Sequence, residues 1–264
     1  MDLELRGRRA LVTGSTAGIG FATARALAAE GAAVVVNGRT ELRVTAAIRS
    51  IREAVPGVHV GGVAADLGTA EGCELLTREV PVADILINNV GIFDPKPFEE
   101  IPDAEWFRFF ETNVLSGVRL SRFYLPGMLA HNWGRIVFVS SESAVQIPAE
   151  MIHYGMTKTA QLAVARGLAE TTAGTGVTVN SVLPGPTASE GVGEFVQRLA
   201  QSKGIDFETM EREFFASARP SSLLRRFAKP EEVASMIVYV CSPRASATNG
   251  AALRVDGGVV RAVV

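Results

Sequence analysis

Tyr154 and Lys158 stand four residues apart, and Ser141 precedes Tyr154 by thirteen positions. If the segment around Tyr154 is helical, Tyr154 and Lys158 lie on one face, a single turn apart. A tyrosine hydroxyl normally loses its proton near pH ~10, and a neighbouring cation stabilises the phenolate and lowers that pKa. Such a tyrosine could exchange a proton with a substrate oxygen near neutral pH.

Tyr-x-x-x-Lys pairs also arise by chance on solvated helix surfaces, so this pair needs further support before it indicates catalysis. Ser141 gives part of that support, because it follows the apolar run 135–139. A buried strand in that run would place the Ser141 hydroxyl beside the helix. The deciding evidence is whether the chain also carries a nucleotide site.

A glycine-rich turn near the N-terminus predicts that nucleotide site. Residues 10–13 read as a buried strand, 19–30 as an alanine-rich helix and 33–36 as a second strand, which makes a βαβ unit with parallel strands. The glycines between strand and helix let the backbone approach a pyrophosphate, which the helix N-terminus then binds. This context favours phosphate binding over an ordinary tight turn, with contacts expected from Gly14, Ser15, Thr16, Gly18, Ile19 and Gly20.

Strands and helices alternate along most of the remaining chain, which is typical of a parallel sheet covered on both faces. We expect further strands at 58–65, 83–87, 135–139, 176–183 and 251–255. We expect helices at 40–54 and 69–79, from Pro102 onward with a bend at Pro126, around Tyr154, and from Lys229.

The carboxyl ends of these strands carry residues suited to a ligand crevice, the edge at which such sheets bind cofactors. They are Asp66, Leu67, Asn88, Asn89, Gly91, Pro184, Gly185, Pro186 and Thr187. For Asn88 and Asn89 two readings stay open: the amides hold the backbone in place, or they line the crevice.

Residues 188–222 break the alternation with two short amphipathic helical patterns, at 193–201 and 207–216. An irregular insertion beside a site predicts a lid over the substrate, and a plain surface excursion is the alternative. Trp106 and Trp133 are expected to pack in the core or an interface.

Composition narrows the class of protein. A chain of 264 residues with 47% hydrophobic residues can bury a large core, and the net charge of −2 gives no case for a nucleic-acid or membrane partner. No run reaches the ~20 apolar residues of a membrane span, and the N-terminus lacks a signal-peptide pattern. Cys73 and Cys241 lack disulfide or metal spacing, and His131 and His153 lack ligand-like partners, so we expect no metal and a cytoplasmic location.

Together, these motifs resemble the short-chain dehydrogenase/reductase superfamily over nearly the whole chain, most commonly its 3-oxoacyl-[acyl-carrier-protein] reductase-like members. The resemblance rests on the order and spacing of Thr13-Gly14-x-x-x-Gly18-x-Gly20, Asp66, Asn88-Asn89-x-Gly91, Asn113, Ser141, Tyr154-x-x-x-Lys158 and Pro184-Gly185. It implies one α/β domain over residues 1–264, doubly wound (Rossmann-type) around a seven-stranded parallel sheet flanked by helices. It also implies a nicotinamide cofactor and, commonly, a homotetramer.

The resemblance implies roles for individual residues. Tyr154 would exchange the proton, Ser141 would hold the substrate oxygen, and Lys158 would hold the cofactor ribose and keep the tyrosine pKa low. Asn113 would be a fourth catalytic residue, interrupting its helix and holding a water that relays protons toward Lys158. Asp66 would contact adenine.

The resemblance also implies a role for Asn89, and the sequence departs from the family pattern at a few positions. Asn89 would lie against the adenosine ribose. Val90 stands where the family usually has alanine, and Glu142-Ser143 follow Ser141 where small residues are commoner. Ser143 is therefore a second candidate hydroxyl, and Ser141 is preferred for its distance from Tyr154.

The expected function is an NAD(P)-dependent oxidoreductase that transfers a hydride between nicotinamide and a small carbonyl or alcohol substrate. A lyase or epimerase on the same fold is one alternative, because a fold does not fix a reaction. A non-catalytic nucleotide-binding regulatory protein is the other.

The end of the second strand bears on cofactor choice. An acidic residue about 20 positions beyond the glycine turn normally binds the NAD ribose and repels the 2′-phosphate of NADP. Gly38 stands at that position, and Arg39 offers a fork of donors suited to phosphate. We predict NADP(H), with hydroxyl contacts from Ser15 and Thr40. NAD(H) is the alternative, with Arg39 solvated and Asn37 accepting from the ribose, since Ala17 leaves the glycine turn without a basic residue.

Overall fold

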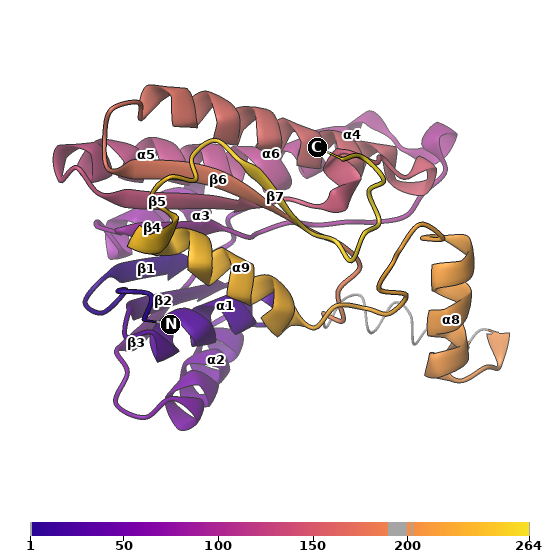
Figure 1. The fold of residues 1–264 in the computed structure, drawn as a ribbon, viewed down its shortest axis with the longest axis horizontal. Coiled ribbons are helices and arrows are strands. Elements are labelled where there is room, and N and C mark those ends of the chain that lie inside the picture. Colours follow the sequence, from indigo (N-terminus) through magenta and orange to yellow (C-terminus); the bar gives the residue numbers. More distant parts are fainter. Residues whose placement is uncertain (1, 190–199, 202, 264) are drawn as a thin grey trace.

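A computed structural model describes residues 2–189, 200–201 and 203–263. Seven parallel strands form one sheet, as the family resemblance implied, and their order is β3-β2-β1-β4-β5-β6-β7 (Figure 1). The strands are β1 (Arg9–Val12), β2 (Ala33–Gly38), β3 (Val60–Ala64), β4 (Ile85–Asn88), β5 (Gly134–Val139), β6 (Val177–Pro184) and β7 (Ala252–Val255).

The central strands are largely apolar because helices bury both of their faces. Leu11 of β1 lies between Val35 of β2 and Leu86 of β4, and every residue of β5 and β6 is buried. Strand order reverses direction between β1 and β4, so the connections from these two strands leave on opposite sides. Their carboxyl ends therefore frame a crevice.

Two helical layers sandwich the sheet (Figure 1). One layer contains α1 (Gly18–Ala29), α2 (Glu41–Ala54) and α9 (Pro230–Cys241), and the other contains α3 (Ala70–Glu79), α5 (Ser116–Ala130) and α6 (Ile152–Thr171). Each layer has its own apolar core against the sheet. Side chains such as Leu27 and Leu120 are fully buried, and each burial of this kind contributes roughly 1.5–3 kcal/mol.

The long helical segment predicted from Pro102 onward is interrupted at Asn113. It consists of α4 (Asp103–Phe110), a π-helical turn at Glu111–Leu115, and α5, which runs through Pro126. The interruption matches what the family resemblance implied for Asn113.

Helix α8 (Phe207–Ser217) lies apart from the two layers (Figure 1), where the sequence predicted a short helix at 207–216. It has a small apolar cluster of its own, built from Met210, Phe214, Phe215 and Phe227. We refer to residues 203–219 as the α8 arm. Most of the other predicted short helix, 193–201, lies outside the described residues.

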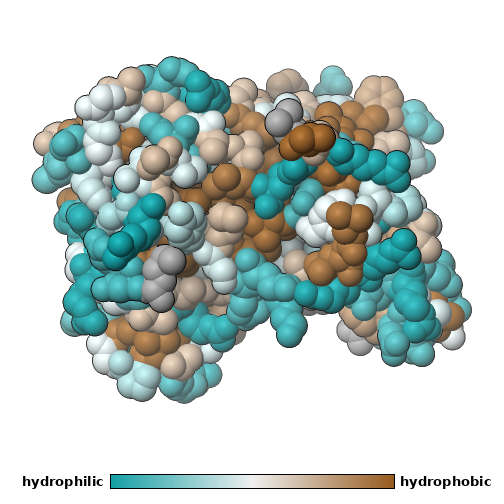
Figure 2. All heavy atoms as spheres, in the orientation of Figure 1, coloured by the Kyte–Doolittle hydropathy of each residue, from teal (hydrophilic) through white to brown (hydrophobic). Residues whose placement is uncertain are grey.

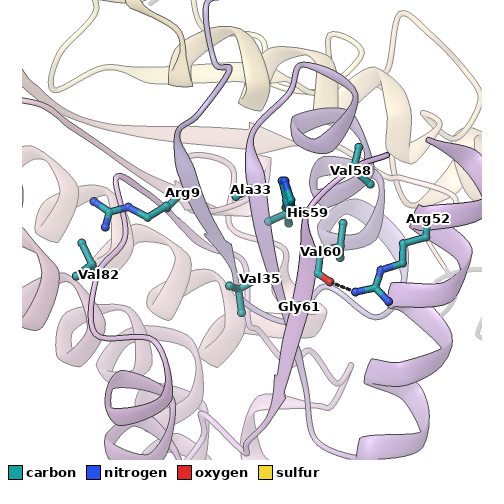
Figure 3. Close-up of a pocket in the computed structure, with 10 residues that line it drawn as sticks. Arg9, Ala33, Val35, Arg52, Val58, His59, Val60, Gly61 and Val82 are labelled. Carbon is teal, nitrogen blue, oxygen red and sulfur yellow. Dashed lines mark hydrogen bonds between the residues drawn. The ribbon is translucent and has the colours of Figure 1, made fainter. Parts of the chain in front are cut away.

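Two further features concern the surface. Within the described part of the chain, no helix has the length and apolar character of a membrane span. A cavity of about 420 Å³ lies at the amino edge of the sheet (Figure 3), where Arg9 pairs with Asp84 and Arg52 donates to the Val60 carbonyl. None of the predicted site residues lines this cavity.

Candidate active site

The larger cavity, of about 1360 Å³, opens at the carboxyl edge of the sheet and brings the predicted nucleotide and catalytic residues together. Ser141 lines it after the end of β5, and so does every residue predicted to bind the cofactor except Ser15. Those residues are Gly14, Thr16, Gly18, Ile19, Gly20, Arg39, Asp66, Leu67, Asn89, Gly91, Tyr154, Lys158, Pro184, Gly185 and Thr187.

The glycine turn forms a shallow cradle at the start of α1. Gly14 and Gly18 have φ values of 58° and 56°, in the left-handed region that glycine tolerates. A Cβ atom on Gly20 would lie 2.5 Å from the Gly14 carbonyl oxygen and from the Asn89 amide nitrogen. No described side chain caps the N-terminus of α1, so its N–H groups are available to an anion. This cradle fits a pyrophosphate.

Ser15 corrects one expectation. Its side chain is fully buried, and its hydroxyl donates to the Val12 carbonyl at 2.6 Å and accepts from the Asn37 N–H at 2.9 Å. The Asn37 side chain is likewise committed, accepting from the Gly14 N–H and donating to the Ala65 carbonyl. Both side chains therefore hold the turn in shape, and of the two only Asn37 lines the cavity.

The two asparagines at the end of β4 divide the two roles that the sequence left open. The Asn89 amide donates to the Thr13 and Gly14 carbonyl oxygens at 3.0 Å and also lines the cavity. Asn88 is buried and donates to the Ser121 hydroxyl. Asn88 is therefore structural, whereas Asn89 braces the turn and faces the crevice.

The end of β2 places the guanidinium of Arg39 at the cavity. Arg39 is exposed, lines the cavity, and has no hydrogen bond or ion pair with any other described residue. The Thr40 hydroxyl accepts from the Arg43 N–H as the N-cap of α2. Gly38 packs tightly, because a Cβ there would lie 2.4 Å from the Thr16 methyl carbon.

Asn113 is buried and does not line the cavity. Its side chain accepts from the Ile92 N–H at 2.8 Å and donates to the Ile92 carbonyl and the Thr157 hydroxyl, each at 3.0 Å. These bonds join the π-helical turn, the loop after β4 and helix α6.

Lys158 is buried among neutral acceptors. Its Nζ donates to the Val139 carbonyl at 3.0 Å and to the Gln161 amide oxygen at 3.3 Å, and Gln161 donates onward to the Asn113 carbonyl at 2.5 Å. Burial lowers the pKa of Lys158 to about 7. Gln161 was not identified from the sequence, although its position three residues after Lys158 places it on the same helix face.

Tyr154 lines the cavity together with Lys158. Its ring is half-buried, and the Lys158 Nζ lies 5.6 Å from the ring centroid. Burial raises the pKa of Tyr154, the hydrogen bond with Ser141 lowers it, the Glu142 carboxylate raises it further and the Arg219 charge lowers it. Together these effects raise the pKa of Tyr154 above its ordinary value in the protein alone.

The Ser141 hydroxyl donates to the Glu142 carboxylate at 2.5 Å and accepts from the Ser143 N–H at 3.1 Å. The Ser143 hydroxyl also donates to Glu142, at 3.3 Å. On its other oxygen, Glu142 accepts from the Arg219 Nε at 3.1 Å. The sequence offered no signal for this ion pair, because Arg219 belongs to the α8 arm.

The remaining aromatic and imidazole residues pack as expected. The buried His153 ring contacts Phe109 at 4.0 Å and Trp106 at 5.9 Å between centroids. Trp133 lies within 3.6 Å of the Arg8 guanidinium carbon. These contacts are structural.

Comparison with known proteins agrees with this geometry. The sequence profile of the family described as short chain dehydrogenase matches residues 8–200. The chain therefore belongs to the short-chain dehydrogenase family, and it is an oxidoreductase that acts on alcohol or ketone groups with a nicotinamide cofactor, NAD(H) or NADP(H).

Individual relatives cover essentially the whole chain. The oxidoreductase YvaG of Bacillus subtilis is 48% identical over 100% of both chains. D-beta-hydroxybutyrate dehydrogenase of Cupriavidus necator is 36% identical, covering 97% of this chain and 99% of its own. The crystal structure of L-sorbose reductase from Gluconobacter frateurii, complexed with NADPH and L-sorbose, superposes with a TM-score of 0.94 at 34% identity over 100% of both chains.

Proposed function

We propose that this protein is an NADP(H)-dependent ketone reductase, able to oxidise the corresponding alcohol, in which Tyr154 is the general acid and base. The observation that carries the proposal is the shared cavity: the glycine turn, Arg39, Ser141 and Tyr154 all line it. A site that holds a dinucleotide at one end and a proton donor at the other suits hydride transfer to a carbonyl.

The protein groups divide the chemistry as follows. When bound, the nicotinamide supplies the hydride. Tyr154 gives its proton to the carbonyl oxygen as negative charge develops there, and Ser141 holds that oxygen. Lys158 holds ribose hydroxyls, and Asn113 fixes the π-helical turn behind Lys158. In alcohol oxidation the proton moves in the reverse direction.

NADP(H) is the proposed cofactor, with NAD(H) as the weaker alternative. The glycine turn and the N-terminus of α1 hold the pyrophosphate, Asp66 and Leu67 lie at the adenine, and Arg39 binds the 2′-phosphate. The position that carries an acid in NAD-preferring proteins is Gly38, which has no charge to repel a phosphate. The sorbose reductase with which this chain superposes was solved with NADPH.

A neutral, hydroxylated ketone is the proposed substrate class. The carboxylates of Glu142 and Glu150 line the cavity and share the Arg219 guanidinium. Because Arg219 already pairs with two carboxylates, it offers no unpaired positive charge to an anionic keto acid, and these polar groups suit hydrogen bonds to substrate hydroxyls. The L-sorbose reductase relative acts on a neutral ketose.

The proposal includes a homotetramer in the cytoplasm, one domain over residues 1–264, and a lid formed by residues 188–222. Phe107 on α4 is 74% exposed and Phe123 on α5 is 46% exposed. Apolar atoms also gather around β7 and the C-terminal segment (Figure 2), so two surfaces suit subunit contacts. Of the lid, the described residues Ser189, Met210 and Arg219 line the cavity.

A substrate panel tests the function. NADPH and NADH oxidation are measured against L-sorbose and other neutral ketoses, acetoacetate, and a 3-oxoacyl thioester, together with the reverse reactions of the alcohols. We expect NADPH-dependent reduction of a neutral hydroxylated ketone with the highest kcat/KM. Faster turnover of acetoacetate, or a preference for NADH, would contradict the substrate class or the cofactor respectively. No turnover with any ketone or alcohol would contradict the reaction itself.

A further inference from the structure

Arg219 places a buried guanidinium at the wall of the cavity. Its side chain is only 10% exposed, and the residue lines the cavity. A buried charge is retained where hydrogen bonds and opposite charges compensate it. The Nε atom donates to Glu142 at 3.1 Å, and Nη1 donates to Glu150 at 3.1 Å and to the Ala218 carbonyl at 2.8 Å. Two carboxylates therefore hold this cation in place.

The third nitrogen of the guanidinium, Nη2, remains available to a ligand. It has no hydrogen-bond partner among the described residues. It is not enclosed either, because it is not among the described side-chain atoms that are both buried and unpartnered. Since Arg219 lines the cavity, the N–H groups of Nη2 are open to a molecule bound there. A charged donor in a largely dry site makes strong hydrogen bonds.

Glu150 offers an acceptor beside this donor. Its Oε1 atom accepts from Nη1 of Arg219, whereas Oε2 has no hydrogen-bond partner in the parts of the chain that the structure describes. The Glu150 side chain is 49% exposed and lines the cavity. Nη2 shares a carbon with Nη1, and Oε2 shares a carbon with Oε1. A free donor and a free acceptor therefore lie next to each other.

A donor next to an acceptor matches a hydroxyl group. A hydroxyl accepts through its oxygen and donates its single hydrogen, so it can bond Nη2 and Oε2 at the same time. A carboxylate has only acceptors, and the negative charge of Glu150 would repel it. A methyl group would leave both polar atoms without a partner once the substrate excludes water, and sites of this kind reject such analogues strongly.

The guanidinium lies close to the reacting groups. The Glu142 carboxylate bonds Arg219 through one oxygen at 3.1 Å, and its other oxygen lies 2.5 Å from the Ser141 hydroxyl. A single carboxylate thus separates Arg219 from Ser141, and Tyr154 lines the same cavity. A ketone whose carbonyl lies at Ser141 and Tyr154 can reach Arg219 with a group a few carbons along its chain.

We propose that Arg219 and Glu150 bind a hydroxyl group of the substrate, a few carbons from its carbonyl, and so select hydroxylated ketones over plain ketones and keto acids. Nη2 donates to the hydroxyl oxygen, and Oε2 of Glu150 accepts the hydroxyl hydrogen. The inference rests on the proposed function, because it names the part of the substrate that the same site recognises. Arg219 ends the α8 arm and Glu150 lies in the loop before α6, so a bound hydroxyl joins these two segments.

Ketones of equal length with different ends test this recognition. Butanone, 4-hydroxybutan-2-one and acetoacetate end in a methyl group, a hydroxyl and a carboxylate, and pentan-2-one, 5-hydroxypentan-2-one and levulinate extend the reach by one carbon. Calorimetry with oxidised cofactor bound gives each Kd without turnover, because oxidised cofactor cannot reduce a ketone. In wild type the hydroxy ketone of at least one length should bind ~10-fold or more tightly than its two partners.

Glu150→Ala should change the preference in a direction that general damage cannot imitate. The hydroxyl loses its acceptor, while hydrogens on Nη1 and Nη2 of Arg219 form a fork that matches a carboxylate. Relative to the plain ketone, the hydroxy ketone should lose at least ~3-fold in affinity and the keto acid should gain ~10-fold or more. Glu213→Ala is the matched control, since Glu213 is a half-exposed carboxylate on the arm that does not line the cavity.

Arg219→Lys assigns the effect to the guanidinium. A lysine keeps a positive charge beside the buried Glu142 but replaces the fork with a single nitrogen. Added to Glu150→Ala, it should remove most of the gain in keto-acid binding. Circular dichroism and the thermal midpoint check that each variant folds, and affinity ratios within one protein cancel any general loss of binding.

The outcomes separate this inference from the proposed function. Equal binding of the hydroxylated and plain ketones by wild type at both lengths, or unchanged preferences in Glu150→Ala, would overturn the hydroxyl site. Turnover decides the reaction separately. If the hydroxy ketones bind with the expected preference but neither NADPH nor NADH reduces any of them, the proposed function fails while the hydroxyl site stands.

Discussion

The Nζ atom of Lys158 lies 3.0 Å from the carbonyl oxygen of Val139, the last residue of β5. This contact places an ammonium group in the interior with neutral hydrogen-bond acceptors around it and no carboxylate bonded to it among the described residues. Burial consequently lowers its pKa from 10.5 to about 7. The group is thus only partly protonated at neutral pH.

The stability of the cofactor-free protein should depend on Lys158 in a predictable direction. Above about pH 7 the unfolded chain keeps a proton on this lysine that the folded protein has released, so the unfolding free energy contributed by Lys158 rises with pH. Lys158→Met should remove that rise. Urea unfolding of both proteins from about pH 6 to pH 8.5 measures it, and the difference between the two profiles isolates Lys158 because both proteins keep the same cysteines and histidines. Parallel pH profiles for the two proteins would contradict the lowered pKa.

Arg39→Ala should reduce the preference for NADPH. A guanidinium bound to the 2′-phosphate makes charge-assisted hydrogen bonds worth about 1.5–3 kcal/mol, so kcat/KM for NADPH should fall ~10-fold or more. The value for NADH should stay the same. Arg49→Ala, an exposed arginine on α2, controls for the loss of one positive charge. If Arg39→Ala kept the wild-type ratio of kcat/KM for NADPH to that for NADH, Arg39 would not be the residue that binds the 2′-phosphate.

A switch toward NADH should require two changes. Gly38→Asp alone introduces a Cβ 2.4 Å from the Thr16 methyl carbon, so we expect a lower thermal midpoint and poor use of either cofactor. Thr16→Ser removes that methyl group and keeps the hydroxyl, and the double variant should recover stability and prefer NADH. The thermal midpoint and the kcat/KM ratio are measured in all four proteins. A fully stable Gly38→Asp single variant would disprove the steric argument.

Light scattering should find a homotetramer at micromolar concentration. If the exposed face of α4 is a subunit interface, Phe107→Asp should give smaller assemblies, because a buried unpaired charge opposes association. Leu42→Asp provides the control, since Leu42 is 81% exposed on α2 in the other helical layer. A monomeric wild type would rule out the tetramer, and equal effects of the two variants would rule out this interface.

The sequence predicted the fold well because its signals are local. Apolar runs mark the strands, and the glycine turn at Gly14 fixes a βαβ start. The interruption at Asn113 came from family resemblance, since no residue of that helix other than the asparagine marks a π-helical turn. Pro126, which the sequence marked as a bend, lies inside α5.

The sequence predicted site contacts only where the interacting residues are close together in the chain. Ser15 was predicted to contact the cofactor, but in the turn after β1 its hydroxyl bonds the Val12 carbonyl and the Asn37 N–H. Arg219 pairs with a residue 77 positions earlier, and no periodicity encodes such a contact. The pKa of Tyr154 also depends on burial, which a Tyr-x-x-x-Lys spacing does not reveal.

Turnover by Tyr154→Phe tests the central claim most directly. The variant lacks only the hydroxyl oxygen, so the fold and NADPH binding, followed by circular dichroism and cofactor fluorescence, should remain as in wild type. General acid–base groups contribute a factor of ~10² or more, and we expect kcat with the best ketone of the panel to fall by at least that amount. Near wild-type kcat in a folded, NADPH-binding Tyr154→Phe protein would contradict the assignment of Tyr154 as the proton donor.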